Sequence, residues 1–179
     1  MELLQGDALD DFFRRGDWRR AFHLETLDAY STPEEDEPFR KFLDGEPDDF
    51  DWLAGWLRVV RDVTDAGKTV DRVRLCTVPH VDYTRFGLYV APRNIAAGED
   101  IRWLPRHLID GSELTVDDWW MFDDNRVGFS IFEPSGKGAG AALTSDPTIA
   151  AYCRAIRDRV WKIAIPHADY VQSEYITRT

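Results

Sequence analysis

The chain has little of what marks membrane, exported or disulfide-rich proteins. It contains two cysteines, Cys76 and Cys153, which lie far apart and form no CxxC pair. No apolar run approaches the roughly 20 residues that span a bilayer. Residues Met1–Asp11 lack the basic start and apolar stretch of a secretory signal. We therefore expect a cytoplasmic protein with reduced thiols and no membrane partner.

The sequence also lacks the motifs of several enzyme classes. It has no GxSxG motif, and Ser130 lies within a predicted strand instead of at a strand-to-helix turn. The glycine-rich run Gly136–Gly140 has neither the spacing of a Walker loop nor a helix after it, so it predicts a hairpin turn. His80 and Asp82 form the one compact group of metal-ligand type, without a second histidine nearby. We expect no catalytic serine, no metal ion and no cofactor.

What is present indicates one folded domain. The 179 residues are 44% hydrophobic and 13% aromatic, with seven tryptophans, which is enough apolar surface for a substantial core. No internal repeat or flexible linker divides the chain. We predict a single globular domain over residues 1–179, with an acidic loop and helix segment at 31–51.

Hydrophobic spacing predicts alternating helices and strands followed by hairpins. The expected helices are Asp7–Arg15, Glu34–Leu43, a helix from Asp51 that stops at Gly67, His80–Ala97 with an interruption near Pro92, and a helix from Pro147 that ends before Pro166. The expected strands are Trp18–Leu27, Val70–Val78, Ile101–Leu104, Trp119–Phe122, Val127–Phe132 and Ala139–Leu143. The fold class is therefore α/β (α+β): a mixed β-sheet with early parallel strands and late antiparallel hairpins, covered by helices.

Two local patterns in the last third of the chain are specific. A two-residue turn at Asp124–Asn125 would join two strands as a hairpin. Asp146 is a good helix N-cap with Pro147 at the first helical position. The helix that follows has one apolar stripe, which we expect to pack into the core: Ile149, Tyr152, Cys153, Ile156, Val160 and Trp161.

Negative charge is concentrated in one segment. The formal net charge is −11, and residues 31–51 hold nine acids against Arg40 and Lys41, which gives −7. Such a field repels phosphate backbones, so we expect no direct nucleic-acid binding, whereas a basic protein would be attracted. The candidate partner-binding residues are Glu34, Glu35, Asp36 and Glu37. The alternative is a solvated face that only keeps the protein in solution.

A second set of polar residues follows the central predicted strands. Ligands of open α/β sheets bind beyond the carboxyl ends of the strands, and arginine side chains suit carboxylate or phosphate oxygens. The candidate ligand-binding residues are Arg74, Asp82, Tyr83, Arg85, Glu99, Asp100, Arg102, Trp120 and Asp123. The alternative is that these residues form salt bridges that order the loops, with one of Trp119 and Trp120 in the core.

Several stretches resemble a family of uncharacterised actinobacterial proteins whose genes often lie beside helix-turn-helix regulators. The matching stretches are Leu3–Asp7, Val73–Pro79, Asp82–Phe86, Ala97–Arg102 and Trp119–Asp124. This resemblance implies a partner or effector in a regulatory gene pair. The arrangement is also loosely similar to half of a phospholipase D-type sheet domain, in which a lysine follows a histidine two residues later. Here Asp82 follows His80, so the apparatus for that chemistry is missing.

These observations favour a non-enzymatic regulatory or interaction protein. Its acidic segment would meet a basic protein partner, which the resemblance suggests is a helix-turn-helix regulator. The alternative function is an enzyme that binds a small molecule or phosphate ester in the arginine, aspartate and tyrosine crevice. The sequence does not indicate whether the chain forms oligomers.

Overall fold

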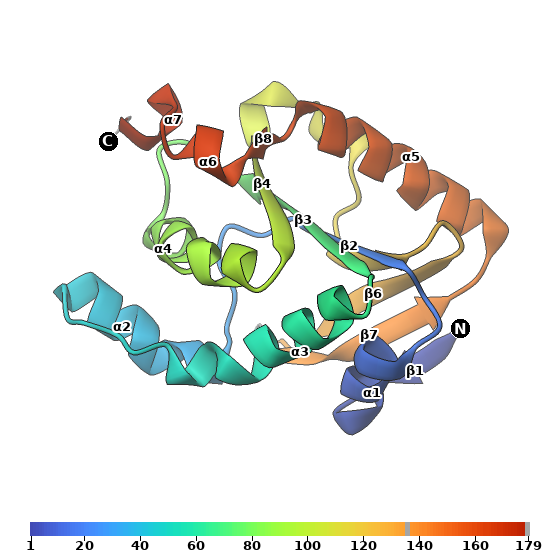
Figure 1. Ribbon diagram of the computed structural model, residues 1–179. Coiled ribbons are helices and arrows are strands. Elements are labelled where there is room, and N and C mark those ends of the chain that lie inside the picture. Colours follow the sequence, from blue (N-terminus) through green and yellow to red (C-terminus); the bar gives the residue numbers. More distant parts are fainter. Residues whose placement is uncertain (135–136, 178–179) are drawn as a thin grey trace.

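The computed structural model describes residues 1–134 and 137–177. Within them, eight strands form one mixed sheet in the order β1-β7-β6-β5-β2-β3-β4-β8 (Figure 1). The three central strands β2, β3 and β4 run parallel, and the neighbours on either side pair antiparallel. The predicted mixed sheet, with early parallel and late antiparallel strands, is confirmed.

The interior strands of the sheet match the predicted ones, and the sheet has one further strand at each edge. Their bounds are β1 (Glu2–Leu4), β2 (Arg20–Glu25), β3 (Thr69–Cys76), β4 (Glu99–Pro105), β5 (Trp119–Phe122), β6 (Arg126–Phe132), β7 (Gly138–Thr144) and β8 (Ile165–Pro166). The edge strands β1 and β8 are short and were not predicted, because two or three residues show no alternation.

The five longer helices follow the prediction closely, whereas the two short helices near the C-terminus were not predicted. Their bounds are α1 (Asp7–Arg15), α2 (Asp36–Asp44), α3 (Ala54–Asp65), α4 (Asp82–Ala96), α5 (Pro147–Ile163), α6 (His167–Tyr170) and α7 (Glu174–Thr177). Short 3-10 turns precede α2 at Pro33–Glu35 and α3 at Asp51–Leu53. Two others follow β4 at Arg106–Leu108 and Gly111–Glu113.

One face of the sheet is covered by α5. Its buried residues Cys153, Ile156 and Val160 pack against Phe22 and Leu24 of β2 and further strand residues in one apolar cluster. Asp146 caps this helix as predicted, because its carboxylate accepts hydrogen bonds from the backbone N–H groups of Thr148 and Ile149.

The opposite face is covered by α1, α3 and α4 (Figure 1). Val59 and Val63 of α3 lie in one cluster with Ala21 and Val70 of the sheet. Placing both crossover helices, α3 and α4, on one face follows from right-handed connections between adjacent parallel strands. Polar side chains on this face of β2 and β3 are therefore enclosed between a sheet and helices.

The predicted interruption near Pro92 is wrong, because α4 continues from Asp82 to Ala96. Proline lacks the N–H that would bond the carbonyl one turn earlier. Pro92 lies on the exposed side of the helix, while Val90, Ala91 and Asn94 on either side of it are buried. Packing against the sheet thus holds the helix together across the missing bond.

Further details differ from the predictions. Phe122 pairs with Arg126, so the β5–β6 turn has three residues, with Asp123 at a φ of 52°, instead of the predicted two at Asp124–Asn125. Tyr152 is 53% exposed and does not belong to the buried stripe of α5. The predicted hairpin turn at Gly136–Gly140 is too long, because Gly138, Ala139 and Gly140 belong to β7; Gly136 lies outside the described residues.

Both cysteines are free and buried, Cys76 in β3 and Cys153 in α5. In the described part of the chain, no helix combines the length and the apolar character needed to cross a bilayer.

Candidate functional site

A network of charged side chains lies on the face of β2, β3 and β4 that α3 and α4 cover. The register places His23 beside Arg72 and Glu25 beside Arg74, all on this face. Glu25 binds both arginines, and Arg72 Nε donates to Glu99 Oε1 at 2.6 Å. The side chains of Arg72, Glu25 and Glu99 are 9%, 7% and 0% exposed, so these ion pairs are buried.

Aromatic rings surround the network. The His23 ring stacks on Trp120 with 4.2 Å between centroids. The Arg72 guanidinium lies 6.0 Å from the ring centres of Trp56 and Trp120, and that of Arg74 lies 5.6 Å from Trp103. These contacts favour the cationic forms of the two arginines.

Burial and charge shift the pKa values of the network strongly. Burial lowers the pKa of His23 to about 3, so this ring is neutral at pH 7. Burial alone would raise the pKa of Glu25, but Arg74 and Arg72 outweigh it and lower this pKa to about 2. Burial would lower the pKa of Arg72, but Glu99 and Glu25 raise it. At pH 7, Glu25 and Arg72 are therefore charged and His23 is neutral.

Two tyrosines meet carboxylates at the C-terminal ends of β2 and β3. The Tyr83 hydroxyl donates to Glu35, and the Tyr30 hydroxyl donates to Asp118 Oδ2 at 2.5 Å. Burial raises the pKa of Glu35, and burial likewise raises that of Asp118. Beside them is an open cavity of about 390 Å³ lined by residues that include Tyr30, Thr32 and Glu35.

The nine predicted ligand-binding residues do not form one site. Arg74 and Glu99 lie on the same face of the sheet, joined through Glu25 and Arg72. Trp120 borders that network through His23, and Tyr83 lies against a small cavity that Arg74 and Glu25 also line. The structure therefore brings four of the nine together: Arg74, Tyr83, Glu99 and Trp120.

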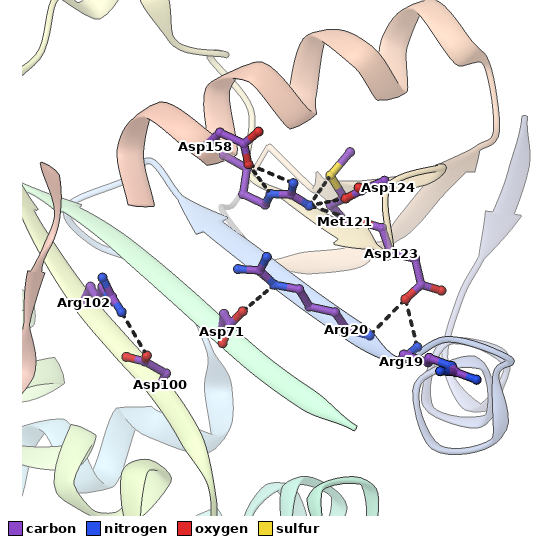
Figure 2. A network of polar contacts seen from close by, with 10 residues as sticks. Arg19, Arg20, Asp71, Asp100, Arg102, Met121, Asp123, Asp124 and Asp158 are labelled. Atoms are coloured by element: carbon purple, nitrogen blue, oxygen red, sulfur yellow. Dashed lines mark hydrogen bonds and ion pairs between the residues drawn. The ribbon is translucent and has the colours of Figure 1, made fainter. Parts of the chain in front are cut away.

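The other five lie elsewhere. Asp82 and Arg85 pair with each other at 3.1 Å on the exposed first turn of α4. Asp100 and Arg102 pair at 3.3 Å on the α5 face of β4, opposite to Glu99, because successive strand residues alternate between faces (Figure 2).

Asp123 is also separate and has a local structural role. Its carboxylate accepts hydrogen bonds from the backbone N–H groups of Arg19 and Arg20 at 2.9 and 3.0 Å, which fixes the β5–β6 turn against β2 (Figure 2). The predicted crevice therefore does not include Asp82, Arg85, Asp100 and Arg102, which pair with each other outside the buried network. Asp123, predicted beside Trp120, lies in the β5–β6 turn instead.

His80 and Asp82 also point to different environments. His80 is buried, and its ring nitrogens contact the carbonyl of Thr77 and the hydroxyl of Tyr170. Asp82 is exposed and binds Arg85. The two side chains therefore have different partners, and they do not lie together as the ligands of one metal ion would.

The acidic segment 31–51 forms α2 and the turns on either side of it, at the edge of the molecule beside α4 (Figure 1). Glu34, Asp36 and Glu37 are exposed. Glu35 differs from them, since it is partly buried and accepts the Tyr83 hydrogen bond. It therefore does not belong with the other three as a free partner-binding residue.

The list of candidate residues omitted Glu25, His23 and Arg72. His23 and Glu25 alternate with apolar Phe22 and Leu24, a pattern that predicts a half-buried strand with one polar face. The sequence did contain a signal. The helices between β2 and β3 indicate that these strands are parallel, and parallel pairing brings Glu25 next to Arg74. Tyr30 and Asp118 lie in loops, and no spacing in the sequence indicates their contact.

The ion pairs inside the network limit what it can bind. Both arginines are neutralised by carboxylates inside the network, so neither is free to bind an external anion without displacing Glu25 or Glu99. The arrangement joins β2, β3 and β4 through buried ion pairs, whereas segment 31–51, with a formal charge of −7, lies outside it.

A search of the curated proteins finds no match to this sequence. A family model described as a domain of unknown function, DUF6879, matches residues 7–172, which is nearly the whole chain. The chain therefore belongs to the DUF6879 family.

Proposed function

We propose that this chain is a cytoplasmic, non-enzymatic interaction protein whose acidic segment binds a basic protein partner. The observation that supports this most directly is the charge of segment 31–51, which amounts to −7 of the net −11 and is displayed on ordered structure. The resemblance to proteins encoded beside helix-turn-helix regulators suggests such a regulator as the partner.

Aromatic packing fixes the acidic segment in place. Phe39 and Phe42 of α2 contact Phe86 of α4 at centroid distances of 5.4 and 5.6 Å. Trp52 stacks on the same Phe86 ring, and its indole N–H donates to Asp48 Oδ2 at 2.8 Å. A surface that is ordered before binding loses less conformational entropy on association than a disordered acidic loop would.

The two bases of the segment are already engaged within it. Arg40 pairs with Asp44 at 2.8 Å and with Glu46 at 3.9 Å, and Lys41 pairs with Glu37 at 3.2 Å. Glu34 and Asp36 have no basic partner inside the segment. The remaining charge faces solvent, where it would steer a basic surface toward α2.

The geometry favours this function over a small-molecule or phosphate-ester enzyme in the Arg/Asp/Tyr crevice. Arg74 is held by Glu25, and the open cavity beside it is lined by the acids Glu35 and Asp36, which would repel a phosphate. The loose similarity to phospholipase D-type domains supports no activity, since Asp82 stands where that motif has lysine.

The proposal can be tested with two variants of equal charge change. The first, Glu34→Gln with Asp36→Asn and Glu37→Gln, removes three exposed acids of the segment but leaves Glu35 and its bond to Tyr83. The control, Asp65→Asn with Asp117→Asn and Asp169→Asn, removes three exposed acids outside it. Both raise the net charge by three.

Each protein serves as bait in cells that express the native chain, and the recovered partner is then purified for direct binding measurements. We expect a basic protein that binds wild type and control alike and binds the acidic-segment variant more weakly. Equal binding to all three proteins would reject the acidic segment as the docking surface.

A further inference from the structure

We propose that the cavity lined by α1, α3 and the strands β5–β7 is a binding site for a small, flat, uncharged ring compound, of a size between one aromatic ring and indole. This site is separate from the acidic segment, which contributes no residue to its lining. In Figure 1 the helices α1 and α3 lie below the strands that form the floor.

The size of the cavity limits the ligand. Its volume is about 140 Å³. An engineered protein cavity of about 150 Å³ with apolar walls stays dry and binds benzene. Pockets for drug-sized ligands and cofactors are larger, from about 300 Å³. The cavity therefore fits a fragment the size of a ring and excludes nucleotides and similar cofactors.

The walls suit an aromatic ring. Phe13 meets Trp120 nearly edge to face at 5.1 Å, and Trp56 meets Trp120 at 6.1 Å. On the other side, Phe12 meets Phe122 edge to face at 4.8 Å. Ring faces and edges around one space are the arrangement in which a further aromatic ring packs well.

One glycine in the floor of the cavity, Gly128, is not required by its backbone conformation. Gly140 on β7 has a φ of +135°, and a side chain there would collide with the Leu4 carbonyl, so its identity is explained. Gly128 in the middle of β6 has no such constraint, since a Cβ would find its nearest neighbour, Leu143 Cδ1, at 3.7 Å. Glycine inside a strand costs stability and often marks a place that a ligand approaches closely.

The ring of Trp120 does not fill this space. Trp120 pairs with His23 on one side and Gly128 on the other, and its ring is stacked on His23. The Trp120 ring therefore leaves the part of the cavity next to Gly128 open.

The polarity of the lining sets the charge of the ligand. None of the lining residues is charged, so an ionised ligand would lose its hydration without a counter-ion. Ser130 lies two residues from Gly128 on the same face of β6, and its hydroxyl has no hydrogen-bond partner within the described residues. It could accept a bond from a ring N–H such as that of indole.

Indole, benzene and 1-hexanol serve as probes, followed by calorimetric titration and by thermal unfolding of the full chain. We expect saturable binding of indole and benzene, a melting temperature that rises with their concentration, and weaker binding of the flexible 1-hexanol. Absence of indole binding at millimolar concentration would overturn the proposal. Equal binding of 1-hexanol and indole would also overturn it, because the cavity would then accept any apolar group.

Gly128→Val places a side chain in the cavity from a strand, where β-branched residues are generally favoured. We expect it to weaken indole binding by on the order of tenfold or more, equivalent to about 1.4 kcal/mol. Gly128→Ala should have a smaller effect in the same direction, and it covers the case in which valine prevents folding. The control Gly111→Ala fills open space on the surface and should bind as wild type does. Unchanged indole affinity in folded Gly128→Val or Gly128→Ala would contradict the site.

Discussion

At the scale of single residues, the chain holds two kinds of core. Beneath α5 the core is apolar, whereas beneath α3 and α4 it contains a charged network around Arg72, Glu25 and Glu99. Replacing a buried apolar side chain leaves a cavity, whereas removing one member of a buried ion pair leaves an uncompensated charge. The two faces of the sheet should therefore respond differently to mutation and to pH.

Ile156→Ala tests the apolar face. Ile156 is 2% exposed in the cluster under α5, so we expect the free energy of unfolding to fall by about 2–5 kcal/mol. Tyr152→Ala on the exposed side of the same helix should change it by only about 0.5 kcal/mol. Chemical denaturation of both variants measures this, and an Ile156→Ala protein as stable as wild type would place the stripe outside the core.

His23→Gln tests the charged face through pH. Burial lowers the folded-state pKa of His23 from 6.5 to about 3, so the unfolded chain binds this proton first as pH falls. The stability associated with neutral His23 is complete above pH 6.5 and is lost as pH falls from there toward 3. Between pH 7 and pH 5 this linkage amounts to about 2 kcal/mol.

We expect His23→Gln to lose about 2 kcal/mol less than wild type over that interval, because its side chain takes up no proton. His107→Gln, on the surface, should retain the wild-type loss. Denaturant titrations at pH 7, 6 and 5 give the comparison. If His23→Gln and wild type lost equal stability, His23 would not be held neutral by burial.

At the scale of elements, local chemistry explains where helices begin and packing explains where they continue. Asp146 begins α5 through its own carboxylate, a contact between neighbours in sequence. Pro92 fails to end α4 because buried residues on both sides keep the helix against the sheet.

Asp146→Ala should lower the free energy of unfolding by about 1 kcal/mol, since two backbone N–H groups lose their acceptor. Asp146→Asn keeps an acceptor oxygen and should cost less. Thermal unfolding of the two variants side by side checks this order, and a larger loss for asparagine than for alanine would contradict the capping role.

The same contrast explains how much could be predicted from the sequence. The interior strands and the helices α1, α2, α3 and α5 were predicted from spacing and capping, which are local. The strand order and the edges β1 and β8 were not, because they depend on pairing between distant segments. The separation of Glu99 from Asp100 and Arg102 follows from the alternation of side chains along one strand, which the prediction did not apply to β4. Arg74 and Glu99 were predicted together and do lie on one face, joined through Glu25 and Arg72, while Asp100 and Arg102, predicted with them, lie on the other.

At the scale of the whole molecule, charge is distributed unevenly over a rigid frame. The charges of the buried network compensate one another within the sheet, while Glu34, Asp36 and Glu37 of segment 31–51 are exposed at one edge. Long-range attraction therefore comes from the region of α2. The proposed binding of a basic partner depends on this separation between paired interior charge and unpaired surface charge.

The association rate of the purified partner tests this claim most directly. Stopped-flow mixing at low and at high salt compares wild type, the variant with Glu34, Asp36 and Glu37 neutralised, and the control with Asp65, Asp117 and Asp169 neutralised. Exposed charges are screened beyond about 8 Å at physiological ionic strength and act mainly on the rate of encounter. We predict that at low salt the acidic-segment variant associates more slowly than wild type and control, and that the difference disappears at high salt. Equal association rates for all three proteins at low salt would contradict the account.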